Sequence, residues 1–347
     1  MNIFFAKFAS LMWGPWLLIL LLGVGFWLTF RLGGIQFRNL FYALRLAFSK
    51  ERSGKGDISH FGALMTALAA TVGMGNIAGV STAVALGGPG AIFWMWMTGL
   101  VGMATKYSES FLAVKYRQVN EHGEISGGPM YYLEHGLGQK WLAICFATFG
   151  SLAAFGIGNM IQANTAATAV VESLGSSKFS VGLILAVLTA LVIIGGIKRI
   201  SDVASIFVPF MVAIYFVGAS IVILSHLSQL GVGIKLILEH AFTGTAATGG
   251  FIGASLALTI RYGVARGLFS NESGMGSAPI AAAAAKTNQP AKQALVSMSG
   301  TFLDTLVICS LTALALASTG VWVSGETGVA LTMQAFSAGL PGNWGAF

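Results

Sequence analysis

Charged residues are scarce in this 347-residue sequence: only 9% of its residues are Asp, Glu, Lys or Arg. Soluble domains carry about 25% charged residues, so this composition excludes an ordinary soluble protein. Hydrophobic residues make up 55% of the chain, and its mean hydropathy is +0.79. The chain contains repeated uncharged runs, each about 20 residues long, which is the length that crosses a bilayer. The sequence therefore predicts an all-α membrane protein with several spans.

Cysteine and histidine are also rare. The two cysteines, Cys145 and Cys309, lie in apolar runs, which argues against a disulfide or a metal site. The five histidines lie in loops or near the ends of spans, and the sequence contains neither HExxH nor GxSxG. We therefore expect neither an enzyme nor a bound cofactor. The net charge of +7 is explained by basic cytoplasmic loops rather than by a nucleic-acid partner.

The apolar runs predict eight spans and four shorter amphipathic segments at the membrane surface. The expected spans are 11–30, 59–86, 91–115, 140–172, 180–196, 203–225, 250–285 and 294–317. The expected surface segments are 35–49, 126–138, 234–240 and 327–336. With these spans, 14 of the 19 lysines and arginines fall on one side of the membrane and three on the other. Because basic loops stay in the cytoplasm, we expect the N-terminus to lie outside.

Two of the expected spans contain polar, glycine-rich interruptions. The second span carries TVGMGN at 71–76, and the seventh carries GLFSNESGMG at 267–276. Glycine costs about 1 kcal/mol relative to alanine inside a helix. Helix breaks within a membrane are tolerated where they are buried in protein or line a wet cavity, and they mark the binding sites of many transporters. The alternative is two intact helices whose glycines allow close packing.

The two interrupted spans begin on opposite sides of the membrane, and each is followed by an ordinary span and a surface segment. This order is typical of inverted repeats. It divides the chain into 1–57 (an extra first span and an amphipathic helix), 58–226 (the first repeat) and 227–347 (a loop and the second repeat). A second repeat as long as the first would extend beyond residue 347. We therefore expect the second repeat to be truncated, with three spans missing.

Three motifs carry a resemblance to a known family: ATVGMGNIAG at 70–79, GGPGAIFWMWMTGLVG at 87–102 and RGLFSNESGMGSAP at 266–279. They resemble the alanine or glycine:cation symporter family, the sodium:alanine symporters, and the similarity follows the whole chain in order. The resemblance implies a leucine-transporter-type fold of 5+5 inverted repeats with one extra N-terminal span. It also implies symport of alanine or glycine with sodium in the plasma membrane of a bacterium or archaeon, and we expect a monomer. Proton-coupled symport and a channel-like pore are the alternatives.

The first interruption offers both kinds of group that a zwitterionic amino acid needs. A helix that starts after a break presents N–H groups and a positive dipole end, here at Met74, Gly75 and Asn76. The helix that ends before the break presents carbonyl groups. The resemblance places the substrate carboxylate at Met74 and Gly75, the amine near Thr71, and sodium at the carbonyls of Ala69 and Val72. The Asn76 side chain is expected to bind sodium or substrate, or to cap the second half-helix.

The remaining site residues come from two other expected spans. Gln162 interrupts the fourth span, where it either contacts substrate or forms an interhelical hydrogen bond. The second interruption supplies Phe269, Ser270, Asn271, Glu272, Ser273 and Gly274 as further substrate-binding residues. The acid Glu272 is expected to neutralise the substrate ammonium, to take part in cation coupling, to pair with Arg266 or Arg261, or to cap the second half-helix. Small residues around both interruptions favour a small substrate such as glycine or alanine.

Two further acids stand outside this set. Asp304 in the eighth span binds a cation or holds the second interruption by hydrogen bonds, and the structural role is favoured. Glu109 is expected to pair with Lys106 on the same helix face.

Overall fold

The computed structural model of the chain describes residue 8 and residues 11–49, 54–121, 123–243, 255–342 and 345. These residues are mostly helical, as the sequence predicts. Among them, β1 (Gln118–Val119) and β2 (Ile125–Ser126) form a small antiparallel sheet that the sequence analysis did not anticipate. Residues 250–254, the expected start of the seventh span, lie outside the described ranges.

Within the described ranges, three helical stretches are long and apolar enough to cross a membrane: 140–171, 196–225 and 290–319. They are formed by α9 (Lys140–Ala153), η2 (Ala154–Met160) and α10 (Ile161–Leu174); by α12 (Gly196–Ser225); and by α16 (Pro290–Thr301), η3 (Phe302–Cys309) and α17 (Ser310–Thr319). If the bent pair of helical segments at 60–71 and 75–87 counts as one span, the structure has a fourth crossing within the described ranges. A membrane protein with several spans is thus confirmed, while the number eight stays a prediction.

The other helices fall close to their expected positions. Three lie at expected spans: α2 (Pro15–Arg31), α7 (Ala91–Lys115) and α11 (Lys178–Ile193). Five lie at expected surface segments: α3 (Ile35–Arg38), α4 (Leu40–Ala47), α8 (Pro129–His135), α13 (Leu227–His240) and α18 (Gly328–Gly339). The 3-10 turn η4 (Val321–Val323) precedes α18. Helix α13 begins at Leu227 rather than at residue 234, so this surface segment is longer than expected.

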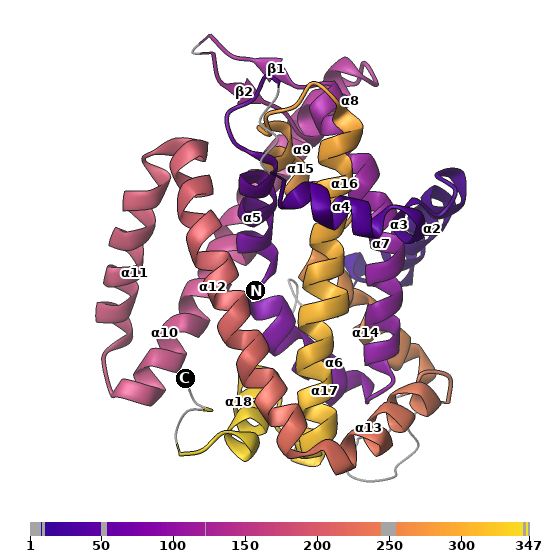
Figure 1. Ribbon diagram of the computed structural model, residues 1–347, viewed down its shortest axis with the longest axis vertical. Coiled ribbons are helices and arrows are strands. Elements are labelled where there is room, and N and C mark those ends of the chain that lie inside the picture. The colour runs from indigo at the N-terminus through magenta and orange to yellow at the C-terminus, as the bar shows by residue number, and fades with distance from the viewer. Residues whose placement is uncertain are drawn as a thin grey trace.

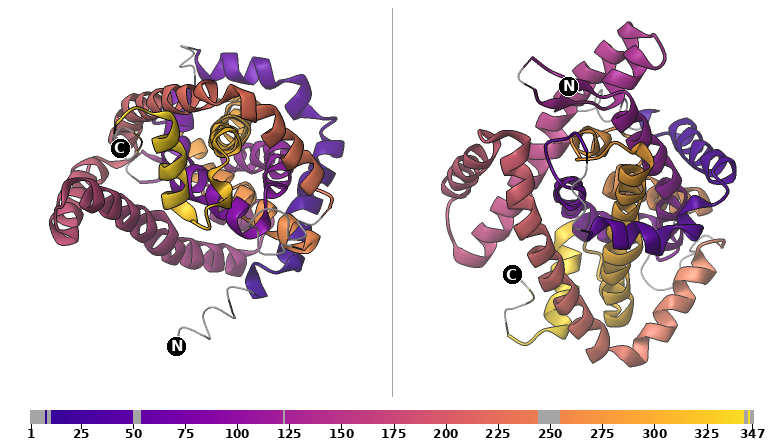
Figure 2. Two further views of the ribbon diagram at one scale, coloured as in Figure 1. Left: turned by 90° about the horizontal axis from the view of Figure 1, so that it is seen from below. Right: turned by 45° about the horizontal axis from the view of Figure 1, so that its top comes forward.

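The helices are sorted into an inner group and an outer flank. Helix α7 packs against both α14 (Leu256–Asn271) and α16, and α17 continues the line of α16 through the middle of the bundle (Figures 1 and 2). Helices α10, α11 and α12 cover one flank (Figure 1). On α9, α11 and α12, large side chains such as Phe149, Ile184 and Phe210 are exposed. In a membrane protein, such apolar surface faces lipid.

The second expected span is broken, as the sequence predicts. It comprises α5 (His60–Thr71), η1 (Gly75–Gly79) and α6 (Val80–Gly87), and its two halves differ in direction by 49°. The break is narrower than the interruption at 71–76. Only Val72, whose backbone is extended, and Gly73 leave the helix, and helical geometry resumes at Met74.

The seventh expected span is also broken, but later than expected. Helix α14 (Leu256–Asn271) continues through the first part of the predicted interruption at 267–276, and α15 (Ala278–Ala283) follows at Ala278. The backbone leaves the helix where left-handed residues cluster: Glu272 has φ 53°, Gly274 has φ 87° and Gly276 has φ 80°. Glycine adopts such angles without steric cost. The break therefore covers residues 272–277.

The two broken helices run antiparallel. The entry to α5 lies beside the exit of α15, because Ile58 forms a β-bridge with Ala285. At the opposite end, the Thr259 hydroxyl near the start of α14 donates to the carbonyl of Gly87 at the end of α6, at 2.7 Å. Figure 1 shows the same arrangement, with α5 above α6 and α15 above α14.

A cluster of backbone contacts, which we call the loop latch, joins the segment before α5 to the segment after α15. It comprises residues 54–58, 283–288 and Arg117. The Arg117 guanidinium donates hydrogen bonds of 2.6–2.8 Å to the carbonyls of Lys55, Ala283, Ala285 and Thr287. Burial lowers the pKa of this guanidinium, and the nearby Asp57 carboxylate opposes the shift. One side chain thus holds together the ends of both broken helices.

Candidate functional site

The break between α5 and η1 is closed by the side chain of Asn76. Its Oδ1 accepts a hydrogen bond from the Gly73 N–H at 2.8 Å, and the Gly73 carbonyl accepts from the N–H groups of Asn76 and Ile77. This is the geometry of a helix cap, in which a side chain three residues into the helix binds the N–H of the capping residue. Of the expected roles for Asn76, the cap is the one that the structure shows.

The two broken helices touch each other at Gly75, close to both breaks. A Cβ atom added at Gly75 would lie 2.8 Å from the Cα of Ser270 on α14, closer than real Cβ atoms approach their neighbours. The absence of a side chain at this position therefore allows η1 and α14 to meet backbone to backbone. The positions that the sequence placed in two separate interruptions form one junction in the fold.

Behind this junction, Asp304 of η3 binds residues from both broken helices. Its carboxylate accepts hydrogen bonds from Asn76 Nδ2 at 2.9 Å, from the Ser270 hydroxyl at 2.8 Å and from the Thr305 hydroxyl at 2.8 Å. The Asp304 side chain is almost entirely buried. Buried charges persist where hydrogen bonds replace their hydration. The expected structural role of Asp304 therefore has a geometric basis: it ties η3 to both breaks.

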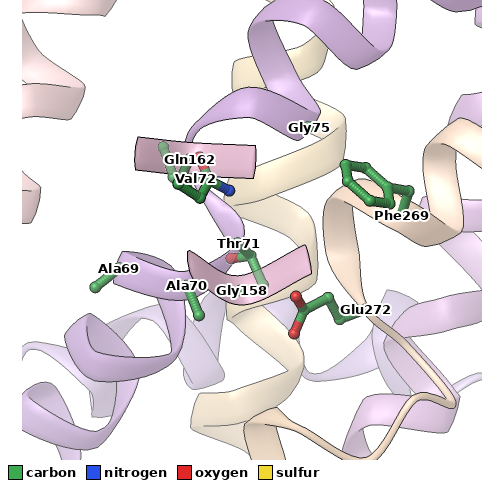
Figure 3. A pocket seen from close by; sticks show the side chains of 9 residues that line it. All are labelled: Ala69, Ala70, Thr71, Val72, Gly75, Gly158, Gln162, Phe269 and Glu272. Atoms are coloured by element: carbon green, nitrogen blue, oxygen red, sulfur yellow. The ribbon is translucent and has the colours of Figure 1, made fainter. Parts of the chain in front are cut away.

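A cavity of about 110 Å³ lies in front of the junction (Figure 3). It is lined by Ala69, Ala70, Thr71, Val72, Gly75, Gly158, Gln162, Phe269 and Glu272. Pockets for drug-sized ligands measure about 300–1,000 Å³, so this cavity suits a much smaller molecule. Its polar side chains are Thr71, Gln162 and Glu272. The Glu272 carboxylate and the Phe269 ring both project toward the end of α5 (Figure 3).

The Gln162 amide belongs to η2–α10 and faces the first break. Its Oε1 lies 3.5 Å from where a Cβ at Gly73 would stand. In the described part of the chain, this amide has no hydrogen-bond partner in the protein, so it is available to a ligand. The Thr71 hydroxyl makes only a long contact of 3.4 Å to the Ala67 carbonyl.

The structure separates the expected site residues into two groups. Lining the cavity are Thr71, Gly75, Gln162, Phe269, Glu272, Ala69 and Val72. Not lining it are Met74, Asn76, Ser270, Asn271, Ser273 and Gly274. Along α14 the reason is helical periodicity: because the helix continues to Asn271, Phe269 faces the cavity while Ser270 is turned toward Asp304. Glu272, the first residue after the helix, lines the cavity from a left-handed backbone.

The residues outside the cavity make hydrogen bonds within the protein. Asn271 Nδ2 donates to the Thr305 hydroxyl at 3.2 Å, while Asn271 Oδ1 accepts from the Ser273 N–H at 2.9 Å. The Gly274 N–H donates to Glu109 at 3.2 Å. These residues shape the second break rather than its cavity.

Two cavity residues, Ala70 and Gly158, were missed by the sequence analysis. Ala70 lies between Ala69 and Val72, whose carbonyl oxygens are expected sodium ligands, so its position in the sequence pointed to the cavity. Gly158 lies one helical turn before Gln162, and that spacing would have found it.

Two expected ion pairs take a different form. The Glu272 carboxylate accepts a hydrogen bond from the Ser277 hydroxyl, and the Arg266 guanidinium stands over the Phe269 ring, 5.8 Å from its centroid. Lys106 and Glu109 bind the backbone of the second break instead of forming a direct ion pair with each other: Lys106 donates to the Glu272 carbonyl, and Glu109 accepts from Gly274. The pairings of Glu272 with Arg266 and of Glu109 with Lys106 are therefore not found in the described residues.

A helical membrane bundle with two broken, antiparallel helices and a small polar cavity at their junction has the construction of a secondary transporter. All 347 residues match the sequence profile of the sodium:alanine symporter family. The chain belongs to this family, and it is a membrane transporter rather than an enzyme.

Three curated relatives illustrate the range of the similarity. The sodium/alanine symporter AgcS of Methanococcus maripaludis is 52% identical over 343 residues, which cover 96% of this chain and 75% of the relative. An uncharacterized transporter of Haemophilus influenzae is 51% identical over 339 residues, which cover 97% of this chain and 74% of the relative. The probable sodium/glutamine symporter GlnT of Bacillus subtilis is 41% identical over 337 residues, which cover 96% of this chain and 69% of the relative.

Proposed function

We propose that this transporter imports alanine or glycine by symport with sodium. The observation that carries the proposal is the small cavity at the junction of the two breaks, which combines an acid, an amide and a hydroxyl with small apolar residues. A relative of 52% identity is named a sodium/alanine symporter. A relative of 41% identity is named for glutamine, but a cavity of about 110 Å³ favours the smaller amino acids.

The cavity suits both charges of a zwitterion. Its acidic side chain, Glu272, faces the end of α5, where the substrate ammonium group would bind. The N–H groups at Met74 and Gly75 begin the second half-helix, whose positive dipole end would stabilise the substrate carboxylate. Of these two residues only Gly75 lines the cavity, so we assign the carboxylate to Gly75 first. Gln162 would hydrogen-bond the substrate from the opposite wall. Of the expected substrate set, Asn76, Ser270, Asn271, Ser273 and Gly274 would act indirectly, by holding the breaks in place.

Sodium would bind at the carbonyl groups that α5 leaves unpaired at its end. The last four carbonyls of a helix have no partner within that helix, and hard cations prefer oxygen ligands. Ala69 and Val72 both line the cavity, in agreement with this role for their carbonyls. The Oδ1 atom of Asn76 already accepts the Gly73 N–H, so we assign sodium to the backbone first.

The antiparallel course of the two broken helices supports the proposed architecture. We propose a 5+5 inverted-repeat fold with the first repeat at 58–226 and the second beginning in 227–347, preceded by an extra span in 1–57. The chain would be a monomer in the plasma membrane with its N-terminus outside. The loop latch would then lie on the cytoplasmic side.

The test is uptake by purified protein in liposomes. With sodium outside only, we expect radiolabelled alanine to accumulate above its external concentration, with glycine as an effective competitor and glutamine as a weak one. Vesicles with equal sodium on both sides, and protein-free vesicles, serve as controls. Accumulation driven by a proton gradient without sodium would identify proton coupling, and equilibration without accumulation would identify a channel. Either result would overturn the proposal.

A further inference from the structure

Two charged residues of α7, Lys106 and Glu109, are buried at the second break without lining the cavity. The exposed fractions of the two residues are 3% and 9%. They lie about one turn apart on one face of the helix, as residues at i and i+3 do. Charged side chains are almost never buried this deeply unless they are paired. Their burial therefore calls for a specific function.

Each of the two side chains binds a backbone group of opposite polarity in the second break. The Lys106 ammonium donates to the Glu272 carbonyl at 3.1 Å, at the C-terminal end of α14. The Glu109 carboxylate accepts from the Gly274 N–H at 3.2 Å. Backbone groups in a break lack helical partners, and a cation at the C-terminal end of a helix is favoured by the helix dipole. The pair thus replaces hydrogen bonds that the break removes.

The residue held in this way has an unusual conformation. Among the described residues, Glu272 is the only non-glycine residue with a positive φ, 53°. Left-handed backbone is disfavoured for residues with a Cβ and persists where the surroundings impose it. In this conformation the Glu272 carbonyl faces Lys106 while its side chain lines the cavity. The backbone contact on one side therefore sets the position of the carboxylate on the other.

We propose that Lys106 and Glu109 are positioning residues: they hold Glu272 in its left-handed conformation and so set the affinity for substrate without contacting it. This inference rests on the proposed function, because it assigns the substrate ammonium to Glu272.

A double-mutant cycle tests the proposal by sodium-driven alanine uptake. Lys106→Gln should raise the alanine KM about tenfold, the order expected when the donor of a hydrogen bond loses its charge, with the maximal rate per folded protein retained. In a Glu272→Gln background, the same change should raise KM by less than about twofold, because the group that Lys106 positions has lost its charge. An equal rise in both backgrounds would overturn the proposal.

Conservative and control variants separate positioning from simple destabilisation. Lys106→Arg keeps the charge and the donor, so its KM should lie closer to the wild-type value than that of Lys106→Gln. Glu109→Ala should raise KM more than Glu109→Gln, whose amide oxygen can still accept from Gly274. Lys115→Gln changes an exposed lysine on the same helix and should leave KM unchanged. Equal KM values for Lys106→Arg, Glu109→Ala, Glu109→Gln and Lys115→Gln would contradict the assignment.

A second measurement does not depend on transport. Met275 in the second break is 36% exposed, and Cys145 is an exposed free cysteine. In a Cys145→Ser background, thiol labelling of Met275→Cys should become several-fold faster when Lys106→Gln is added. An unchanged labelling rate would overturn the inference. If wild-type protein transports no alanine, the proposed function fails, and the labelling still reports whether Lys106 holds the break.

Discussion

The contact between the two breaks at Gly75 gives the sharpest prediction. In Gly75→Ala, the new Cβ would lie 2.8 Å from Ser270 Cα and 3.2 Å from Ser270 Cβ and Oγ. Ordinary contact begins at 3.4 Å, so the junction must open by about 0.6 Å. The nearest of these atoms belongs to the backbone, so rotation of a side chain cannot relieve the overlap. Because Ser270 is next to Phe269, opening the junction also displaces a wall of the cavity.

The magnitude follows from known costs of overpacking. Inserting a methyl group into a packed interior costs about 1–3 kcal/mol. If this cost falls on the substrate-bound state, the alanine KM should rise about 5- to 150-fold, at about 1.4 kcal/mol per tenfold change. The free energy of unfolding should change less, because alanine is about 1 kcal/mol more favourable than glycine inside a helix and offsets part of this cost.

Gly73→Ala is the matched control, since it adds the same methyl group two residues earlier. Its Cβ would meet only the Gln162 Oε1, at an ordinary 3.5 Å. We expect its KM to change by less than about threefold, because no atom is forced to move. Initial rates of sodium-driven alanine uptake, normalised to folded protein, measure both variants. Equal KM values for Gly73→Ala and Gly75→Ala would refute the steric argument.

Three further predictions concern other parts of the structure. Gln162→Ala should raise the alanine KM by a factor that corresponds to about 1–3 kcal/mol, the cost of an unpaired buried polar group; unchanged substrate affinity in a folded variant would remove Gln162 from the site. Arg117→Ala should lower the thermal unfolding midpoint in detergent, because four carbonyls of the loop latch lose their donor, whereas Lys115→Ala should not. Glu124→Cys, between β1 and β2, should react with an impermeant thiol reagent only from the cytoplasmic side, and labelling from outside would reverse the proposed topology.

Local patterns predicted much of the helical framework. The scarcity of charge and the apolar runs identified a membrane protein, because the bilayer imposes span length and apolarity on each segment separately. The first break was placed in the right region because Gly73 is unfavourable inside a helix, but it is narrower than expected, since Gly75 stays helical in η1. The second was placed too early: glycine and polar residues begin at Gly267, but α14 stays helical to Asn271. Hydrogen bonds from Ser270 to Asp304 and from Asn271 to Thr305 accompany that extension.

What the sequence alone determined is therefore the class of protein, the course of most helices and the existence of two breaks. Only the tertiary structure decided which residues of each break face the cavity. Along α14, a shift of the helix end by a few residues turns Ser270 and Asn271 away and leaves Phe269 facing the cavity. Asp304, which Asn76 binds, and the partners of Lys106 and Glu109 lie far away in the sequence. No local pattern encodes such contacts, because they arise only when α7, η3 and the two broken helices pack together.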